Sequence, residues 1–271
     1  MRVGFVGLGN QGAPMARMID RGGFELYLWA RRAASLEPFA DTGATAVERL
    51  VDLGERCDLI GVCVVDDRDV AQVALEPDGL LVTMRPDAIL VIHSTVHPET
   101  CKRVAERAGQ VGVHVLDAPV SGSGQAALSQ TLSVLAGGED AVFARARPVL
   151  ECYGNPISHL GPLGSGQLAK LLNNVAFYAN LRVAATVLTV ADEFGMERKA
   201  LIEVMKASSG RSMGLDTAAG DLSSSMVDHI LTMGRKDLEL AGDIVAPGSA
   251  LATLAAESKK GLLAALVARN E

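Results

Sequence analysis

Short apolar runs alternate with segments of helical periodicity along residues 2–160 of the chain. The runs are rich in Val, Ile and Leu, which is typical of strands buried on both faces of a parallel sheet. Between them, apolar residues recur at helical spacing, which predicts helices with one buried face. This pattern predicts strands at 2–6, 24–29, 58–64, 88–92, 113–116, 132–135 and 156–160, and helices at 11–21, 47–53, 68–75, 98–108 and 140–150. Such alternation predicts an α/β fold with a doubly wound parallel sheet.

The pattern changes near Gly161 and Pro162, and no strand is predicted beyond them. Helical periodicity covers 165–194, 197–207, 235–245 and 249–267, while the Ser- and Gly-rich stretch 208–225 predicts a loop with short helical turns. The sequence therefore predicts two domains, an α/β domain at residues 1–161 and an all-α domain at residues 162–271.

The composition is that of a folded, acidic protein, with 49% hydrophobic residues and a formal net charge of −7 over 271 residues. The negative charge argues against nucleic acid or an anionic membrane as the main partner. The apolar stretch 168–190 is long enough to suggest a membrane span, but several of its side chains are costly in hydrocarbon. These are Lys170, Asn173, Asn174, Asn180 and Arg182. We therefore expect a buried helix of a soluble protein.

Neither the N-terminus nor the cysteines suggest secretion. Glycines interrupt the first apolar run at once, so no signal peptide is predicted. The four cysteines form no CxxC pair, and we interpret them as reduced thiols of a cytoplasmic protein. His93 and His97 are four residues apart, but Pro98 disfavours a shared helix face and no carboxylate cluster accompanies them, so no metal is expected.

A glycine-rich motif follows the first predicted strand and opens the first predicted helix. It reads GxGxxG and consists of Gly7, Leu8, Gly9, Asn10, Gln11 and Gly12. Gly7 permits the tight turn, Gly9 lets the backbone approach a pyrophosphate, and Gly12 lets the helix pack closely on the strand. The helix N-terminus adds free N–H groups for a phosphate. An ordinary glycine-rich turn is the alternative, but the context favours a dinucleotide-binding Rossmann domain.

The end of the second predicted strand bears on the choice of dinucleotide. Sites for NAD usually place an acidic residue there to bind the ribose hydroxyls. This chain has Arg31 and Arg32 after Ala30, with no acid. Arg31 suits a 2′-phosphate through a forked, charge-assisted contact, and Arg32 is able to assist. The alternative is a solvated surface pair, and we favour NADP(H) over NAD(H).

Ser94 and Thr95 follow the predicted strand 88–92, and Val64 ends the predicted strand 58–64. Ligands of doubly wound sheets lie beyond the carboxyl ends of the strands. We therefore expect these three residues to contact the cofactor, with Ser94 and Thr95 bonding the ribose or the nicotinamide. A helix cap before Pro98 is the alternative role for Thr95.

Small residues form a tight loop at 117–123, after the predicted strand 113–116. Its exposed N–H groups suit a carboxylate, which makes Ser121, Gly122 and Ser123 candidate substrate-binding residues. Taken alone, this stretch is more typical of a turn than of a site.

Lys170 and Asn174 share one face of the predicted helix 165–194, because they are four residues apart. Burial lowers the pKa of a lysine, which suits Lys170 to proton transfer near neutral pH, and Asn174 is able to hold the substrate oxygen or the ammonium. A lysine that extends its ammonium to solvent is the alternative. Lys236 and Asp237 begin the predicted helix 235–245, where the simplest interpretation is an exposed charge pair.

Four of these motifs, in this order, resemble the β-hydroxyacid dehydrogenase family, which includes 3-hydroxyisobutyrate dehydrogenase, tartronate semialdehyde reductase and the glyoxylate and succinic semialdehyde reductases. The motifs are GLGNQGAPM at 7–15, DAPVSG at 117–122, GSGQLAKLLNN at 164–174 and KDLELA at 236–241. The resemblance implies that Lys170 is the catalytic acid or base. It also implies that Ser121, Gly122 and Asn174 hold the substrate and that Lys236 reaches the nicotinamide end.

This chain departs from the family pattern at three positions. Members often have Met where Gln11 stands and Gly where Ser123 stands, and NADPH-using members often have Asn at position 30, where this chain has Ala. Imine reductases share the architecture but usually replace the lysine, so the presence of Lys170 argues against that alternative. A non-catalytic dinucleotide-binding protein on the same fold is the alternative from another class, and Lys170 and Asn174 argue against it as well.

The function predicted from the sequence is hydride transfer between NADP(H) and a small hydroxy acid, or its semialdehyde or keto form. We expect a small carboxylic-acid substrate. We also expect a homodimer or homotetramer, because the stretch 168–190 is too apolar for the surface of a small helical domain and the family resemblance implies the same.

Overall fold

The computed structural model describes residues 1–267, so the last four residues of the predicted helical domain lie outside the described part. The chain forms two compact units, Met1–Lys170 and Leu171–Glu271. The division between the units falls inside one long helix, α7 (Ser165–Glu193), whereas the sequence predicts the domain boundary at residue 161.

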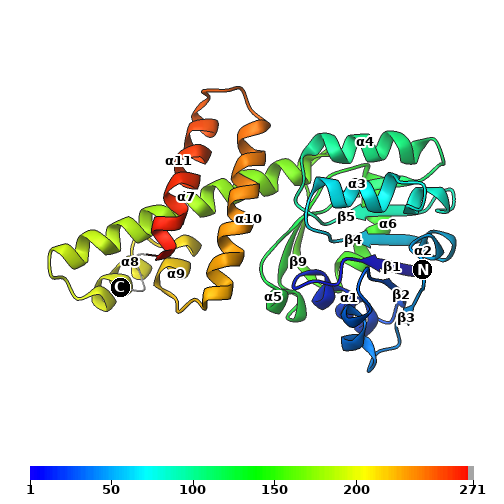
Figure 1. The fold of residues 1–271 in the computed structure, drawn as a ribbon, viewed down its shortest axis with the longest axis horizontal. Helices are drawn as coiled ribbons and strands as arrows, with labels where there is room; N and C mark the ends of the chain where they lie inside the picture. The colour runs from blue at the N-terminus through cyan, green and yellow to red at the C-terminus, as the bar shows by residue number, and fades with distance from the viewer. Residues whose placement is uncertain (268–271) are drawn as a thin grey trace. The chain divides into compact units, whose positions relative to one another are not determined.

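The first unit is built on a six-stranded parallel sheet of order β3-β2-β1-β4-β5-β6 (Figure 1). The strands are β1 (Arg2–Val6), β2 (Glu25–Trp29), β3 (Thr45–Ala46), β4 (Leu59–Val62), β5 (Ile89–Ile92) and β6 (His114–Asp117). Its helices are α1 (Gly12–Arg21), α2 (Val51–Arg56), α3 (Asp67–Leu75), α4 (Pro98–Gly109), α5 (Gly124–Leu128) and α6 (Asp140–Leu150). The strand order reverses between β1 and β4, so the predicted doubly wound sheet is confirmed.

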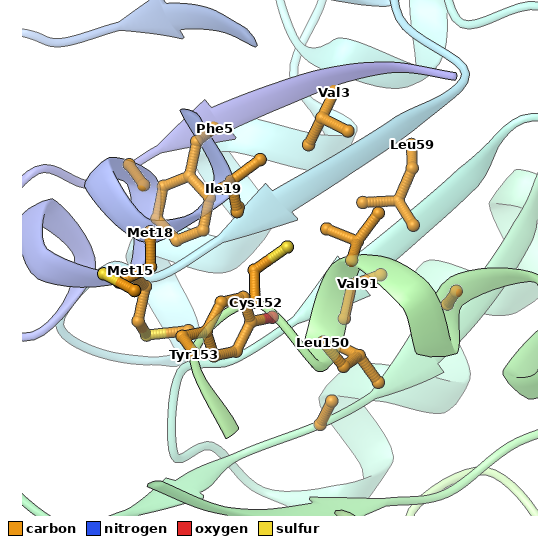
Figure 2. Close-up of a cluster of buried hydrophobic side chains, with 14 of the residues drawn as sticks. Val3, Phe5, Met15, Met18, Ile19, Leu59, Val91, Leu150, Cys152 and Tyr153 are labelled. Carbon is orange, nitrogen blue, oxygen red and sulfur yellow. The ribbon is translucent and has the colours of Figure 1, made fainter. Parts of the chain in front are cut away.

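Alternate residues of each strand serve the two faces of the sheet. Val3 and Phe5 of β1 face a cluster with residues of α1 and α6, whereas Val6 faces a second cluster with residues of α2, α3 and α4. Figure 2 shows the first cluster, in which Phe5 and Tyr153 lie among the α1 side chains Met15 and Met18. Because both faces are covered, the strands read as continuous apolar runs.

A second, smaller sheet lies outside the main one, whereas the sequence predicts a single sheet. The predicted strands at 132–135 and 156–160 form β8 (Leu132–Ala136) and β9 (Gly154–His159), which pair with each other and not with β6. The third strand, β7 (Val120–Ser121), pairs antiparallel to β8 within the loop at 117–123. A two-residue strand is too short to produce a hydrophobic pattern, so the pattern did not indicate β7.

The described part of the second unit is helical, as predicted. It contains the remainder of α7 together with α8 (Arg198–Ala207), α9 (Met213–Ala219), α10 (Ser224–Asp243) and α11 (Ala250–Val267). The predicted helix 235–245 begins too late, because Ser223 caps α10 by accepting a hydrogen bond from Met226 N at 3.3 Å. Val227, Ile230 and Leu231 of this missed half pack against the core of the unit.

Within the described residues, α7 is long and apolar enough to cross a membrane by length and composition alone. Its side chains Leu171, Val175 and Leu181 are instead buried in the core of the second unit. Gly234 of α10 lies so close to α7 that a Cβ atom there would stand 2.8 Å from the ring of Tyr178. These contacts are those of a core helix packed among others.

Candidate active site

The glycine-rich motif forms a tight turn between β1 and α1. Gly7 has a φ of +95°, and a Cβ atom there would collide with the carbonyl of Cys63. A Cβ on Gly12 would collide with the carbonyl of Gly7, so the start of α1 packs closely on the turn. At Gly9, by contrast, no atom of the other described residues, its two chain neighbours aside, lies within 4 Å of the position that a Cβ would take. The three glycines therefore meet the three requirements of a dinucleotide turn.

The turn also leaves a polar group without a partner. The side-chain amide nitrogen of Gln11 is buried and finds no hydrogen-bond acceptor among the described residues. A buried unsatisfied donor is costly, and this one belongs to the residue at the N-cap of α1, two positions after Gly9. An anionic group such as a pyrophosphate would accept hydrogen bonds there, so the residues present fit a bound dinucleotide.

Arg31 and Arg32 follow β2 and are exposed. The Arg31 guanidinium forms an ion pair with Asp69 in the first turn of α3, at 3.1 Å between Nη2 and Oδ1. Arg31 keeps 65% of its side chain exposed, so part of its donor fork still faces solvent.

The loop after β5 is buried more deeply than expected from the sequence. Ser94 is 2% exposed, and its hydroxyl oxygen accepts a hydrogen bond from the backbone N–H of Val64 at 2.8 Å. Its hydroxyl therefore joins the ends of β4 and β5. Thr95 is half-buried beside it, and the cap of α4 is His97, whose ring nitrogen accepts from Glu99 N at 3.1 Å. Thr95 is thus not the cap of α4.

The loop at 117–123 places its three candidate substrate residues in different settings. Ser121 lies in β7 and is half-buried, and Gly122 has a φ of +129°. Ser123 is exposed and caps α5, its hydroxyl oxygen lying 3.4 Å from the N–H of Ala126. The hydroxyl of Ser123 is therefore engaged by its own helix.

Asp117, at the end of β6, is fully buried and binds the N-terminus of α7. Its two carboxylate oxygens each accept one backbone N–H, from Gly164 at 2.7 Å and from Gln167 at 2.7 Å. Burial raises the pKa of Asp117 to about 6, although these N–H groups oppose the rise. The carboxylate thus fixes the start of the helix that carries Lys170.

Gln167 is also fully buried, and its side chain binds the loop after β5. The amide nitrogen donates to the carbonyl of Ser94 at 2.8 Å, and the amide oxygen accepts from the N–H of Val96 at 3.1 Å. The carboxyl ends of β5 and β6 therefore both attach to the first turn of α7.

Lys170 is half-buried and is the last residue of the first unit. Asn174 lies one turn further along α7, in the second unit, where it is buried and donates to Asp237 at 2.6 Å. The same carboxylate pairs with Lys236 at 3.4 Å. Asp237 is 5% exposed, so the expected exposed charge pair is instead a buried group that links Asn174 to Lys236.

A buried histidine lies next to the site. His93 directly follows β5 and stacks on Phe5. One ring nitrogen receives a hydrogen bond from the Tyr153 hydroxyl at 3.2 Å, and the other donates to the carbonyl of Ala118 at 2.8 Å. Burial lowers the pKa of His93 to about 4, which keeps the ring neutral. In the described residues, no group of three His, Cys, Asp or Glu side chains is placed to hold a metal ion.

Sequence reasoning missed the roles of Gln167 and Asp237 and the buried state of Asp117. Gln167 lies inside the motif GSGQLAKLLNN at 164–174. Its position three residues before Lys170 is the sequence feature that could have indicated its role. The hydrogen-bond partners of these side chains are between 47 and 73 residues away along the chain, so spacing could not reveal them.

The fold and the glycine turn define a dinucleotide-binding protein with a Rossmann unit and a helical unit. Residues 2–161 match the sequence model of the NAD-binding domain of 6-phosphogluconate dehydrogenase. Residues 164–270 match the model described as the NAD-binding of NADP-dependent 3-hydroxyisobutyrate dehydrogenase.

Two curated relatives come from Pseudomonas aeruginosa. A 3-hydroxyisobutyrate dehydrogenase is 35% identical over 214 residues, 79% of this chain and 72% of the relative. An NAD-dependent L-serine dehydrogenase is 31% identical over 79% of this chain and 72% of that protein.

Solved structures resemble the whole chain. A Mycobacterium tuberculosis 3-hydroxyisobutyrate dehydrogenase with L-serine superposes with a TM-score of 0.86 at 25% identity, covering 100% of both chains. A protein called Psf3, in complex with NADP+ and 2-OPP, gives a TM-score of 0.86 at 27% identity over 96% of this chain and 92% of the other. An imine reductase from Myxococcus stipitatus gives 0.70 at 19% identity, covering 99% and 94%, which shows the fold alone.

The chain therefore belongs to the β-hydroxyacid dehydrogenase family and is an NAD(P)-dependent oxidoreductase. The resemblance noted from the four motifs is confirmed.

Proposed function

We propose that this protein transfers hydride between NADP(H) and a small hydroxy acid, or its semialdehyde or keto form, with Lys170 as the general acid or base. The observation that carries the proposal is the anchoring of α7. Asp117 and Gln167 hold its first turn at the carboxyl ends of β5 and β6, three residues before Lys170. Ligands of this fold lie beyond those strand ends.

The proposed roles of the chain's own residues are as follows. The turn at Gly7, Gly9 and Gly12 receives the pyrophosphate, and the N-terminus of α1 favours its negative charge. When bound, the dinucleotide supplies or accepts the hydride. Lys170 donates a proton to the carbonyl oxygen during reduction, or takes the hydroxyl proton during oxidation.

The substrate contacts are proposed for individual residues. Backbone N–H groups around Ser121 and Gly122 grip the carboxylate, and Asn174 orients the reacting oxygen. Because Asn174 already donates to Asp237, its amide plane is held in one orientation. Lys236 is proposed to approach the nicotinamide end, and its ion pair with Asp237 restrains it.

The names of the relatives favour one class of substrate. Both 3-hydroxyisobutyrate and L-serine carry a hydroxymethyl group on the carbon next to a carboxylate. We propose that this chain acts on an acid of the same type, oxidising the primary alcohol to a semialdehyde or reducing the semialdehyde.

The proposal is tested with Lys170→Ala. General acid–base catalysis contributes about 10²–10⁴-fold, so kcat should fall by that order while NADPH binding stays nearly intact. Turnover is followed as NADPH oxidation on glyoxylate, succinic semialdehyde, tartronate semialdehyde, methylmalonate semialdehyde and a cyclic imine.

The same screen separates the alternatives. Unchanged turnover in Lys170→Ala would remove Lys170 from the mechanism. Turnover of the imine alone would favour imine reduction. Tight NADPH binding with no turnover of any substrate would favour a non-catalytic protein.

A further inference from the structure

We propose that Gln167 is a positioning residue that couples the cofactor loop after β5 to the catalytic end of α7. The inference rests on the proposed function, because it concerns where Lys170 stands relative to Thr95. It goes beyond that function by assigning a role to a side chain that touches neither substrate nor cofactor in the mechanism above.

The contacts of Gln167 bracket Thr95. The amide nitrogen donates to the carbonyl of Ser94, at 2.8 Å, and the amide oxygen accepts from the N–H of Val96, at 3.1 Å. The two bonds therefore hold the peptide groups on both sides of Thr95. A side-chain amide with a bond at each end is fixed in both position and plane.

The same residue is tied to the end of β6 through its backbone. Its N–H donates to the Asp117 carboxylate at 2.7 Å. Ser94 in turn accepts from the N–H of Val64 beyond β4, at 2.8 Å. The ends of three neighbouring strands, β4, β5 and β6, are thus connected to one turn of helix, and Lys170 lies on the next turn.

A purely structural role would be redundant here. Asp117 already accepts N–H groups from Gly164 and Gln167 and so anchors α7 without the Gln167 side chain. What the side chain adds is a connection to the Ser94–Val96 segment. Displacing reacting groups by about 1 Å costs about 10²-fold in rate, so a connection of this kind affects catalysis more than binding.

The first test uses Gln167→Met, which keeps the length of the side chain and removes both hydrogen bonds. We expect kcat to fall at least tenfold and the primary deuterium isotope effect with 4-deuterated NADPH to rise, because hydride transfer becomes slower than the other steps. The Kd for NADPH should change less than threefold. Gln130→Met is the matched control, since it removes a side-chain amide bond to the Cys152 carbonyl elsewhere in the same unit.

Hydrogen exchange, measured without cofactor, accompanies the kinetic test. In cofactor-free Gln167→Met, backbone amides of residues 94–96 should exchange hydrogen faster than in the wild type, while the first turn of α7 keeps its protection through Asp117. Unchanged exchange at 94–96, or wild-type kcat and isotope effect in the folded variant, would overturn the inference. If Lys170→Ala loses activity while Gln167→Met keeps the wild-type kcat, isotope effect and hydrogen exchange, the proposed function stands and only the coupling is rejected.

A second variant keeps the inference testable if Gln167→Met does not fold. In Gln167→Glu, a protonated carboxyl is able to donate to Ser94 and accept from Val96 as the amide does, whereas the ionised form repels the Ser94 carbonyl. Burial raises the pKa of such a carboxyl above its ordinary value of about 4.3. The ratio of variant to wild-type kcat should therefore rise at least tenfold from pH 8 to pH 5, and a flat ratio would contradict the proposal.

Discussion

At the scale of single residues, the site consists of polar side chains whose partners are defined and buried. Asp117, Gln167 and Asp237 each receive or donate short hydrogen bonds away from solvent. Interactions of this kind are costly to break, because the remaining partner stays buried and unsatisfied. They therefore fix geometry, which general acid–base chemistry requires.

The proposed preference for NADP(H) over NAD(H) rests on Arg31. We predict that Arg31→Ala weakens the binding of NADPH by about 10–100-fold and the binding of NADH by less than threefold, because one charge-assisted contact is worth about 1.5–3 kcal/mol. Binding of both cofactors is measured by titration calorimetry.

The ion pair of Arg31 supplies the control for that experiment. Asp69→Ala releases the guanidinium without removing it, so NADPH binding should persist or tighten. An equal loss of NADPH and NADH in Arg31→Ala would reject the 2′-phosphate contact.

At the scale of elements, α7 belongs to both units. Its first turn is bound by β5 and β6 residues, and its later turns form the core of the helical unit. Its last turns also expose a stripe of apolar side chains at helical spacing, Val183 at 59%, Val187 at 39%, Val190 at 42% and Phe194 just beyond at 79%. Contiguous exposed apolar surface of this kind marks an interaction site.

This stripe supports the proposed homodimer or homotetramer. We predict that light scattering at micromolar concentration gives a mass of at least two chains. Val187→Asp should shift the mass toward the monomer, because a charge placed in an apolar interface is left unpaired. Glu193→Gln, a change at an already polar position of the same helix, is the control. A monomeric wild type would contradict the prediction.

At the scale of the whole molecule, two buried titratable groups, His93 and Asp117, contribute to the pH dependence of the stability of the first unit. His93 stays neutral in the fold because burial lowers its pKa to about 4, whereas the unfolded chain takes up the proton below the ordinary value of 6.5. Its contribution to the free energy of unfolding is therefore lost as the pH falls from about 6.5 to about 4. The difference between the two pKa values corresponds to about 3 kcal/mol.

Asp117 acts in the opposite sense. Burial raises its pKa to about 6 from 3.8, so the folded state binds the proton first as the pH falls. The contribution of Asp117 to the free energy of unfolding therefore falls as the pH rises from about 4 to about 6. The two contributions partly cancel in the wild type over that range.

Variants separate the two effects. We predict that the stability advantage of the wild type over His93→Gln shrinks by about 3 kcal/mol between pH 7 and pH 4. Urea unfolding of the cofactor-free protein, followed by the fluorescence of Trp29, measures it, since this single tryptophan lies in β2 of the same unit. As the pH falls, the free energy of unfolding of Asp117→Asn should decrease more steeply than that of the wild type. Parallel curves of unfolding free energy against pH for all three proteins would contradict both assignments.

The sequence determined the features that depend on neighbouring residues. The apolar runs predicted five strands of the main sheet, because strands buried on both faces leave a continuous signal. The glycine turn and the start of α7 were predicted for the same reason, since their residues are adjacent. Short elements such as β3 and β7 were missed, because two residues hold too little periodicity. The helix α9 lies within the stretch 208–225, where short helical turns were predicted.

Only the tertiary structure decided which buried polar groups meet. Asp117 lies 50 residues from Gln167, and Gln167 lies 73 residues from Ser94, yet each pair is within hydrogen-bonding distance. The pairing follows from parallel strands that bring their carboxyl ends to one edge of the sheet. A linear pattern records which residues are polar but not which distant partner the fold supplies. For that reason Lys170 could be proposed from the sequence, whereas the residues that hold it in place could not.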